Sequence, residues 1–271
     1  MPSKPGSSGS VVSLWRYPIK SMMGEELNSA IITERGLYGD RAYALIDISS
    51  RKVVSAKNPR KWARMFDCRA AYSNNANATG TVRISLTDGT EVTSASDNIN
   101  FVLSNVFDRE VRLQSVAPEV LSFEEYWPDT DGLPYRNAVT DESLAPETLF
   151  DGATMHVLTT ATLDWLRRLY PDGRFEARRF RPNIVVMPTS TQTGFVENTW
   201  VGRTLVIGDD VRLHVTRPCP RCVMTTMAQG DLPKDPGILR AAAKHNELNV
   251  GVYAEVLYAG TVKRGDTVVL E

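Results

Sequence analysis

The sequence predicts a β-rich α+β fold, with a β-rich N-terminal half, a β-barrel-like C-terminal half and few helices. Short runs of β-branched and aromatic residues, bounded by turn residues, recur along the whole chain. Asp88-Gly89 and Gly208-Asp209-Asp210 lie between such runs, where β-hairpins turn. Few segments carry the i, i+3, i+4, i+7 spacing of apolar residues that marks an amphipathic helix.

The expected strands and helices follow from these patterns. Strands are expected over residues 11–15, 41–46, 81–87, 90–93, 184–186, 250–257 and 267–270, with a further hairpin over 205–216. Three helices are expected from their caps, which are Ser96 or Asp97, Thr160 or Thr162, and Asp235 followed by Pro236. Pro171-Asp172-Gly173 ends the second helix.

The same patterns divide the chain into segments. Residues 1–10 are rich in Pro, Gly and Ser and are expected to form a disordered leader. A first domain is expected over residues 11–121 and a second over 146–271. Residues 122–145 are rich in Glu, Asp, Pro and aromatic side chains without a clear period, which indicates a long connecting loop. Structured loops of this length often form lids or substrate walls.

Composition excludes several classes of protein. A formal net charge of −1 gives no electrostatic support for a nucleic-acid partner. No apolar run approaches the roughly 18 residues that span a bilayer, so no membrane partner is expected. Three cysteines cannot build a disulfide framework or a four-cysteine iron–sulfur cluster. We therefore expect a cytoplasmic monomer that takes any electrons it uses from another molecule.

The most informative stretch is the proline-stiffened turn Cys219-Pro220-Arg221-Cys222, which is followed by Val223-Met224-Thr225-Thr226. Thiolates are soft metal ligands and nucleophiles, and neighbouring guanidinium charge lowers the pKa of a thiol. By itself the turn is compatible with a redox pair, half of a zinc site or two small core residues. A zinc site would also need a histidine and a fourth ligand at a recognisable spacing.

Basic residues gather in three other motifs. Lys20 and Ser21 follow a strand that Pro18 ends, Arg41 begins another strand, and residues 178–183 read Arg-Arg-Phe-Arg-Pro-Asn. Three arginines in four positions, in a chain of almost no net charge, indicate an anion pocket, because Arg binds phosphate bidentately. Taken singly, such residues are usually solvated surface charges. The three histidines, His156, His214 and His245, are scattered and are assigned no chemistry.

Five motifs occur in a characteristic order: YPIKS at 17–21, GDRAYALID at 39–47, FRPNIVV at 180–186, CPRCVMTT at 219–226 and GTVKRGD at 260–266. Together they resemble the MOSC superfamily of molybdenum-cofactor proteins. The resemblance is greatest to the branch that contains the mitochondrial amidoxime-reducing component and YcbX-type proteins, and it covers the chain from about residue 11 to the end. It implies an N-terminal MOSC_N-type β-rich domain and a C-terminal MOSC β-barrel.

The resemblance also implies site residues. It makes Cys222 the protein ligand of molybdenum and the residue essential for catalysis. It places the cofactor's pterin and phosphate against Lys20, Ser21, Arg41, Arg181, Asn183, Pro220, Arg221 and Tyr253. Asp151 matches a segment near the pterin, where only backbone contacts are expected because the following side chains depart from the family pattern.

The implied function is a molybdenum-cofactor (Mo-molybdopterin) reductase that removes oxygen from small N-hydroxylated compounds. Its electrons would come from a separate donor, a flavoprotein with an iron–sulfur or haem carrier, since three cysteines cannot hold a four-cysteine cluster. The cofactor would perform the redox step while the protein binds and orients. Two alternatives stay open: a sulfur carrier or sulfurtransferase that uses a Cys222 persulfide, and a cofactor-binding module without turnover. A zinc site built on Cys219, Cys222 and a histidine is a more distant alternative.

Overall fold

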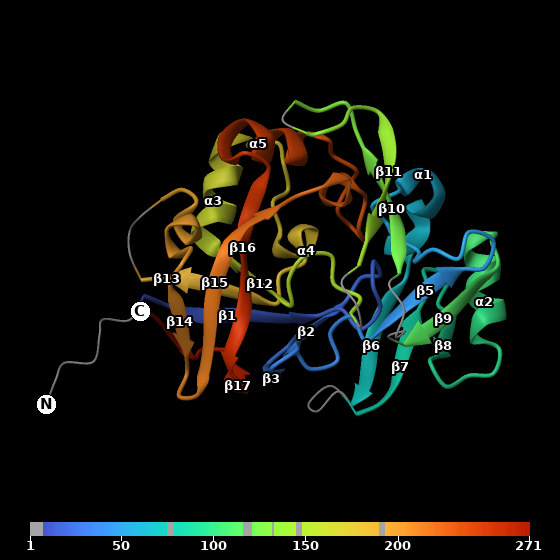
Figure 1. Cartoon of the computed structure of the whole chain (residues 1–271), viewed down its shortest axis with the longest axis horizontal. Coiled ribbons are helices and arrows are strands. Elements are labelled where there is room, and N and C mark those ends of the chain that lie inside the picture. Colours follow the sequence, from blue (N-terminus) through green and yellow to red (C-terminus); the bar gives the residue numbers. More distant parts are fainter. Residues whose placement is uncertain (1–7, 75–78, 116–120, 132, 145–147, 190–192) are drawn as a thin grey trace, which may run out of the picture.

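The computed structural model describes residues 8–74, 79–115, 121–131, 133–144, 148–189 and 193–271. Most of the expected leader, residues 1–7, lies outside the described residues. Strands predominate, as the sequence predicts, and helices are few and short (Figure 1).

Within the described residues, seven strands close into a barrel. The order around it is β13 (Ile184–Pro188), β12 (Met155–Thr159), β16 (Asn249–Tyr258), β15 (Val211–Pro220), β14 (Thr204–Ile207), β18 (Thr267–Leu270) and β1 (Gly9–Arg16). β1 pairs with β13 to complete the ring, and β2 (Glu25–Leu27) adds to the other end of β1. Aliphatic side chains of nearly all these strands fill the interior. The expected barrel is therefore confirmed.

The barrel uses strands from both ends of the chain. β1 pairs antiparallel with β13, with Val11 opposite Val186, and its register shifts between Val11 and Ser13. In the C-terminal half, β12 and β13 pair in parallel. The N-terminal strand β1 therefore belongs to the same barrel as the C-terminal strands. The expected division into domains at residues 122–145 stays a prediction.

Smaller sheets and three short helical segments make up much of the described N-terminal half, and one of these sheets takes in a strand from near the C-terminus. The sheets are β3 (Ser29–Thr33) with β4 (Gly36–Leu37) and β17 (Gly260–Lys263), β5 (Tyr43–Asp47) with β9 (Val111–Ser115), and β6 (Arg69–Asn74) with β7 (Thr79–Ser85) and β8 (Glu91–Thr93). Around them lie α1 (Pro59–Trp62), the 3-10 helix η1 (Ala63–Asp67) and α2 (Ile99–Phe107). Their core also takes in Met224 and Met227, so the segment after Cys222 packs against this half.

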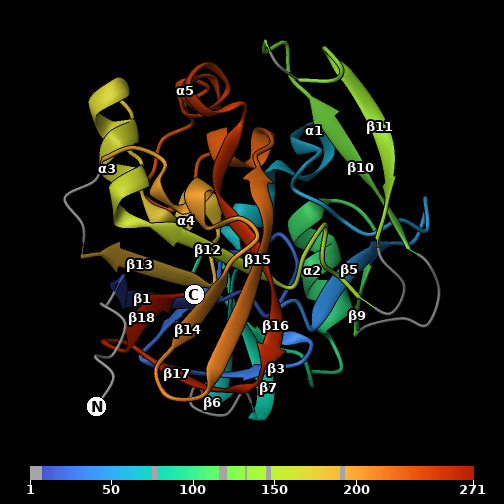
Figure 2. The same ribbon diagram turned by 60° about the vertical axis from the view of Figure 1, so that its left-hand side comes forward.

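Helices of the C-terminal half pack on the outside of the barrel (Figures 1 and 2). α3 (Thr160–Leu169) is capped by Thr159, whose hydroxyl accepts a hydrogen bond from the Thr162 amide, so both predicted caps, Thr160 and Thr162, were too late in the sequence. α5 (Gly237–Asn246) follows Asp235-Pro236 as expected, and Asp235 accepts from the Gly237 amide. α4 (Ala177–Phe180), η2 (Val196–Trp200) and η3 (Val223–Thr226) are single turns.

The segment predicted as a long loop contains a hairpin instead. β10 (Ser122–Trp127) pairs with β11 (Ala138–Ser143), with Trp127 opposite Ala138 (Figure 2). Four acidic residues, Glu124, Glu125, Asp141 and Glu142, hid the strand pattern. Lys61 pairs with Glu124 and Lys57 pairs with Glu125. These ion pairs offset the repulsion between neighbouring carboxylates, so the acidic segment can form a strand. The loop prediction was wrong for these strands.

No helix among the described residues has the length and apolar character that crossing a membrane requires.

Candidate functional site

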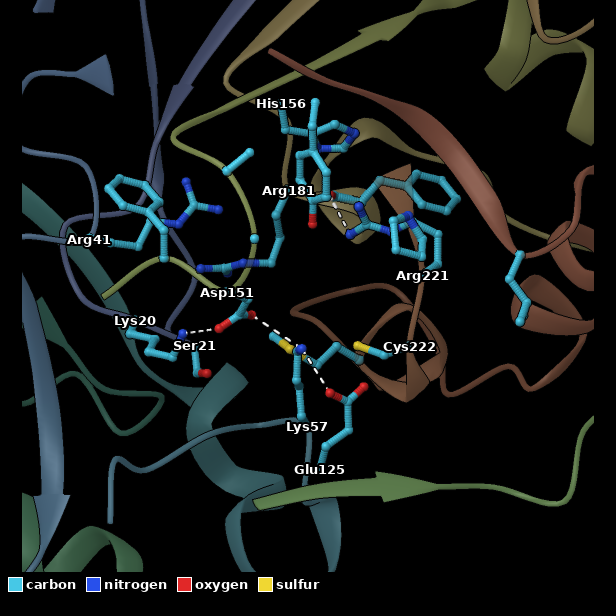
Figure 3. Close-up of a pocket in the computed structure, with 18 of the residues that line it drawn as sticks. Lys20, Ser21, Arg41, Lys57, Glu125, Asp151, His156, Arg181, Arg221 and Cys222 are labelled. Carbon is cyan, nitrogen blue, oxygen red and sulfur yellow. Dashed lines mark hydrogen bonds and ion pairs between the residues drawn. The ribbon is translucent and has the colours of Figure 1, made fainter. Parts of the chain in front are cut away.

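A cavity of about 380 Å³ lies where the barrel end, the N-terminal half and the β10–β11 hairpin meet (Figure 3). Every residue that the sequence placed in the site lines this cavity: Lys20, Ser21, Arg41, Asp151, Arg181, Asn183, Pro220, Arg221, Cys222 and Tyr253. These residues come from segments more than 230 positions apart in the sequence, so the fold alone brings them together.

Two arginines of the cavity share one aromatic side chain. The guanidinium carbons of Arg41 and Arg181 lie 4.6 and 4.1 Å from the ring centre of the buried Tyr17. Both arginines have left-handed backbones, with φ of 48° and 54°. The Tyr17 ring offsets part of the repulsion between the two cations, because the negative face of an aromatic ring attracts cations.

Asp40 holds Tyr17 and Arg41 in this arrangement. Its carboxylate accepts hydrogen bonds from the Tyr17 amide at 2.7 Å and from Asn183 Nδ2 at 2.9 Å, and it also pairs with Arg41. Arg181 donates to the Met22 carbonyl at 2.6 Å. Burial, and then the charge of Arg41, lower the pKa of Arg181 to about 10. The protein therefore holds cations close together at a free-energy cost, which a bound anion would relieve.

Ser21 and Asn183 line the cavity, yet their polar atoms bond within the protein. Ser21 has a φ of 67°, and its hydroxyl accepts from the Ala56 amide at 3.1 Å. The Asn183 side-chain oxygen accepts from the His156 amide at 3.1 Å, while its Nδ2 bonds to Asp40. Both side chains hold the wall of the cavity in place. The oxygen and the nitrogen of the Asn183 amide both bond within the protein, so this side chain is not free to bind the edge of a heterocycle.

A chain of alternating charges crosses the floor of the cavity (Figure 3). Lys20 donates to the Leu149 carbonyl at 2.9 Å and pairs with Asp151. Lys57 Nζ lies 3.4 Å from the other oxygen of Asp151 and 2.9 Å from Glu125. The Asp151 side chain is thus engaged by the two lysines, and its expected backbone contacts to the pterin stay a prediction. No sequence motif pointed to Lys57, and Glu125 lies in the segment expected to form a substrate wall.

Burial would raise the pKa of Asp151, but Lys20 and Lys57 hold it well below its usual range. Burial lowers the pKa of Lys20, against the opposing effect of Asp151. Burial raises the pKa of Glu125, although Lys57 opposes that rise. The two lysines and two carboxylates balance one another, so the excess positive charge of the cavity comes from its arginines, Arg41, Arg181, Arg217 and Arg221.

The two cysteines of the turn differ in position and in charge state. Cys222 lines the cavity, whereas Cys219 is fully buried and does not. Burial alone would raise the pKa of Cys219, but Arg221 and then His156 lower it to about 6. Burial, followed by the charge of Glu125, raises the pKa of Cys222 to about 11. Flanking arginine therefore activates the inaccessible thiol, and only Cys222 can meet a group in the cavity.

Arg221 links the turn to the cavity. One terminal nitrogen of its guanidinium contacts Cys219, and the other donates to the Phe180 carbonyl at 2.8 Å. Its Nε is buried and has no hydrogen-bond partner among the described residues. A guanidinium fixed at two corners, with one unused donor beside a cavity, suits an anionic or hydrogen-bond-accepting ligand.

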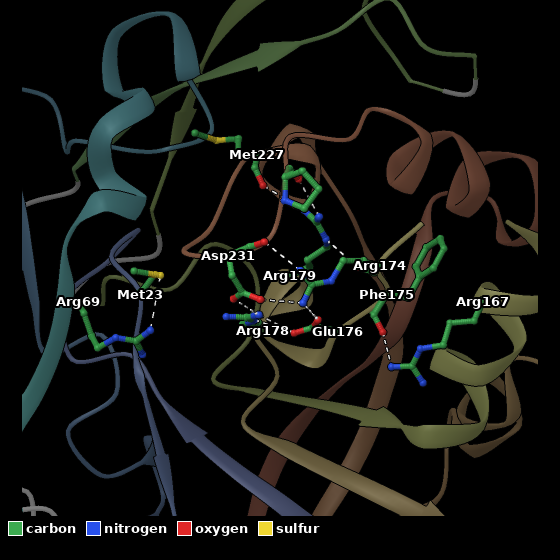
Figure 4. A network of polar contacts seen from close by, with 11 residues as sticks. Met23, Arg69, Arg167, Arg174, Phe175, Glu176, Arg178, Arg179, Met227 and Asp231 are labelled. Carbon is green, nitrogen blue, oxygen red and sulfur yellow. Dashed lines mark hydrogen bonds and ion pairs between the residues drawn. The ribbon is translucent and has the colours of Figure 1, made fainter. Parts of the chain in front are cut away.

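The three arginines of residues 178–181 do not form one anion pocket as expected, because a helical turn points them in different directions. Arg178 pairs with Glu176 and Asp231 at the surface (Figure 4). The fully buried Arg179 donates to the carbonyls of Arg174, Thr225, Met227 and Pro233, which holds the segment after Cys222 in place. Of the three, only Arg181 lines the cavity.

Tyr253 closes one side of the cavity together with residues that the sequence did not single out. Its ring lies 4.7 Å from the guanidinium carbon of Arg217 and 6.0 Å from the centre of the His156 ring. His156, to which no chemistry was assigned, lines the cavity, and its Nε2 lies 3.1 Å from the Val250 carbonyl. Gly251 has a φ of 81°, and a Cβ there would approach His156 Nε2 to 2.2 Å. Only glycine fits this position.

The cavity fits a molybdenum cofactor in its donor set. Arg41, Arg181 and Arg221 exceed the carboxylates around them, and Arg221 Nε is unused, which suits a phosphate. Cys222 supplies one soft sulfur ligand, and a bound metal cation would remove its proton despite its raised pKa. No cluster of three His, Cys, Asp or Glu side chains that could hold a metal by itself occurs in the described part of the chain.

This fold and site define a class of protein. The chain matches the model of the MOSC domain over residues 146–269 and that of the MOSC N-terminal beta barrel domain over residues 8–113. It therefore belongs to the MOSC-domain family, in the branch that joins these two domains.

Individual relatives are distant. The chain is similar to mitochondrial amidoxime-reducing component 1 of Mus musculus, with 27% identity over 81% of this chain and 66% of the relative. It is 26% identical to the Homo sapiens protein of the same name over the same shares. The YUAD protein from Bacillus subtilis is a structural match with a TM-score of 0.49 and 11% identity, over 97% of this chain and 95% of that one. This chain spans about two thirds of the length of the mouse and human amidoxime-reducing components.

Proposed function

We propose that this protein is a molybdenum-cofactor-dependent reductase of N-hydroxylated compounds. The observation that carries the proposal is one cavity that combines an excess of arginine charge with a single accessible thiol, Cys222. Similarity to amidoxime-reducing components supports the same reaction class. When bound, the cofactor supplies the two-electron chemistry by which a substrate loses its oxygen.

The chain's own residues bind and orient in this proposal. Arg41 and Arg181 hold the phosphate through guanidinium N–H groups, and Arg221 adds its unused Nε–H. Lys20 adds a point charge and pairs with the Asp151 carboxylate. Tyr253 and Pro220 shape the wall beside the pterin, and Cys222 holds the metal. Ser21 and Asn183 act indirectly, because their bonds fix the backbone that carries Lys20 and His156.

We further propose that the protein acts in the cytoplasm as a monomer and receives its electrons from a separate flavoprotein with an iron–sulfur or haem carrier. Three cysteines, two of them fully buried, provide no place for a cluster of its own.

The test combines composition with turnover. Purified protein should contain molybdenum and release a fluorescent oxidised pterin, and it should reduce benzamidoxime to benzamidine with a chemical electron donor. Molybdenum and pterin without turnover would favour a binding module instead. A labile persulfide on Cys222, with neither molybdenum nor pterin, would favour sulfur transfer and contradict the proposal.

A further inference from the structure

The end of the cavity beside Cys222 differs from its arginine-lined end. Trp127, Leu133 and Pro134, all from the β10–β11 hairpin, also line the cavity. Strand alternation puts Glu125 and Trp127 on one face of β10 and Tyr126 on the other. Glu125 and Cys222 lie on the same side of the cavity (Figure 3), so this face of β10 is turned toward the Cys222 sulfur.

Trp127 is held in one orientation by the hairpin itself. Its Nε1 donates to the Thr140 hydroxyl at 2.7 Å, and that hydroxyl donates to Glu142 at 2.8 Å. The Tyr135 ring lies 5.6 Å away at an interplanar angle of 58°. The single polar atom of the indole is thus used across the hairpin, so Trp127 offers the cavity only aromatic carbon.

The charged groups next to this aromatic surface are already paired. Glu125 bonds to Lys57 at 2.9 Å, and Lys57 also lies 3.4 Å from Asp151. Among the described residues, three of the four arginines that line the cavity are assigned to the cofactor phosphate, and the fourth, Arg217, stacks on Tyr253 and donates to the Gly152 carbonyl. A molecule that enters beside Cys222 therefore meets a fixed aromatic side chain and a neutralised ion pair, which favours an uncharged planar ring over an anion or a small aliphatic group.

We propose that Trp127 is a specificity-determining residue, against which the ring of a planar aromatic N-hydroxylated substrate stacks while its N–OH group points toward the metal at Cys222. This inference rests on the proposed function for its chemistry. Stacking of a flat ring on an aromatic side chain contributes about ten-fold or more in affinity. Aliphatic substrates with the same N–OH group gain none of it.

The experiment compares two substrates with one reacting group, aromatic benzamidoxime and aliphatic acetamidoxime, on cofactor-loaded enzyme with a chemical electron donor. Trp127→Leu should raise KM for benzamidoxime by about ten-fold and change KM for acetamidoxime less than about two-fold, with kcat largely kept. Trp127→Phe should recover most of the preference. Tyr126→Leu is the matched control, because that ring faces away and stacks on Arg60 at 4.1 Å.

A binding measurement separates this inference from the proposed function. Calorimetric titration of oxidised loaded protein, without electron donor, should show tighter binding of benzamidoxime than of acetamidoxime and loss of the difference in Trp127→Leu. If the wild type binds in this way but reduces neither compound, the proposed function fails and Trp127 still selects aromatic ligands. Equal loss for both compounds in Trp127→Leu, or no loss for either, would overturn the role of Trp127.

Discussion

Replacing Arg181 with Met should weaken the cofactor while leaving the empty protein nearly as stable as the wild type. The pKa of Arg181 falls from 12.5 to about 10, mainly through burial and then through Arg41. At about 1.4 kcal/mol for each pKa unit, holding this charge in the empty cavity costs about 3 kcal/mol. Met, an unbranched apolar side chain of similar reach, removes that cost.

The interactions that Arg181 would lose are of similar size. Its hydrogen bond to the Met22 carbonyl, at 2.6 Å, contributes about 1.5–3 kcal/mol because the donor is charged. Its stacking on Tyr17, at 4.1 Å, contributes up to about 2 kcal/mol in a desolvated place. The two sides nearly cancel, so the free energy of unfolding of the cofactor-free protein should change by only about 1 kcal/mol or less.

Cofactor affinity has no such compensation. Loss of one charge-assisted contact to the phosphate costs about 1.5–3 kcal/mol, which lowers pterin occupancy at limiting cofactor by about ten-fold or more. The assay pairs urea unfolding of the cofactor-free protein with pterin fluorescence after reconstitution. Arg178→Met is the control, since it removes the same charge from the same helical turn outside the cavity. Full occupancy in Arg181→Met, or a loss of several kcal/mol in stability, would refute this reasoning.

Three further predictions follow from the site and the core. Cys222→Ala should abolish reduction of benzamidoxime while much of the pterin stays bound, whereas Cys219→Ala should keep measurable activity; complete loss in both would indicate dithiol chemistry instead. Burial raises the pKa of Glu197, which accepts from Thr159 and Thr162, so its stabilising contribution is full below about pH 4.3 and is lost as pH rises through the folded pKa. Urea unfolding from pH 4 to 8 should therefore show Glu197→Gln gaining stability relative to the wild type with increasing pH, and parallel curves would contradict this. NADH or NADPH as sole electron source should give no turnover of the purified loaded protein, a result that turnover with NADH alone would disprove.

Local chemistry determined most of the elements. Asp88-Gly89 turns between β7 and β8, and Asp235-Pro236 precedes α5, because turn and cap residues act through their own backbone. The β10–β11 hairpin escaped prediction for the opposite reason. Its acidic residues are typical of a loop in the sequence. In the folded chain lysines from residues 52–61 neutralise them, and a sequence pattern cannot show that pairing.

The members of the site were predictable from motif order, but their roles were not. Arg178, Arg179 and Arg181 look alike in sequence, yet one lies at the surface, one supports backbone carbonyls and one faces the cavity. Cys219 and Cys222 share the same flanking arginine, and burial raises the pKa of both thiols. The guanidinium contacts Cys219, where together with His156 it outweighs burial, whereas Glu125 adds to the effect of burial at Cys222, so the two pKa shifts are opposite.

The sequence by itself therefore determined the β-rich class, the barrel, the family and ten of the residues that line the cavity, because these depend on periodicity, turn chemistry and ordered motifs. The tertiary structure decided which side chains keep an unused hydrogen-bond donor, which charges are balanced by an opposite charge and which thiol is accessible from the cavity. It also brought Lys57, Glu125, Trp127 and His156 to the site. Burial and distance set these properties, and both arise only when segments far apart in the chain come together.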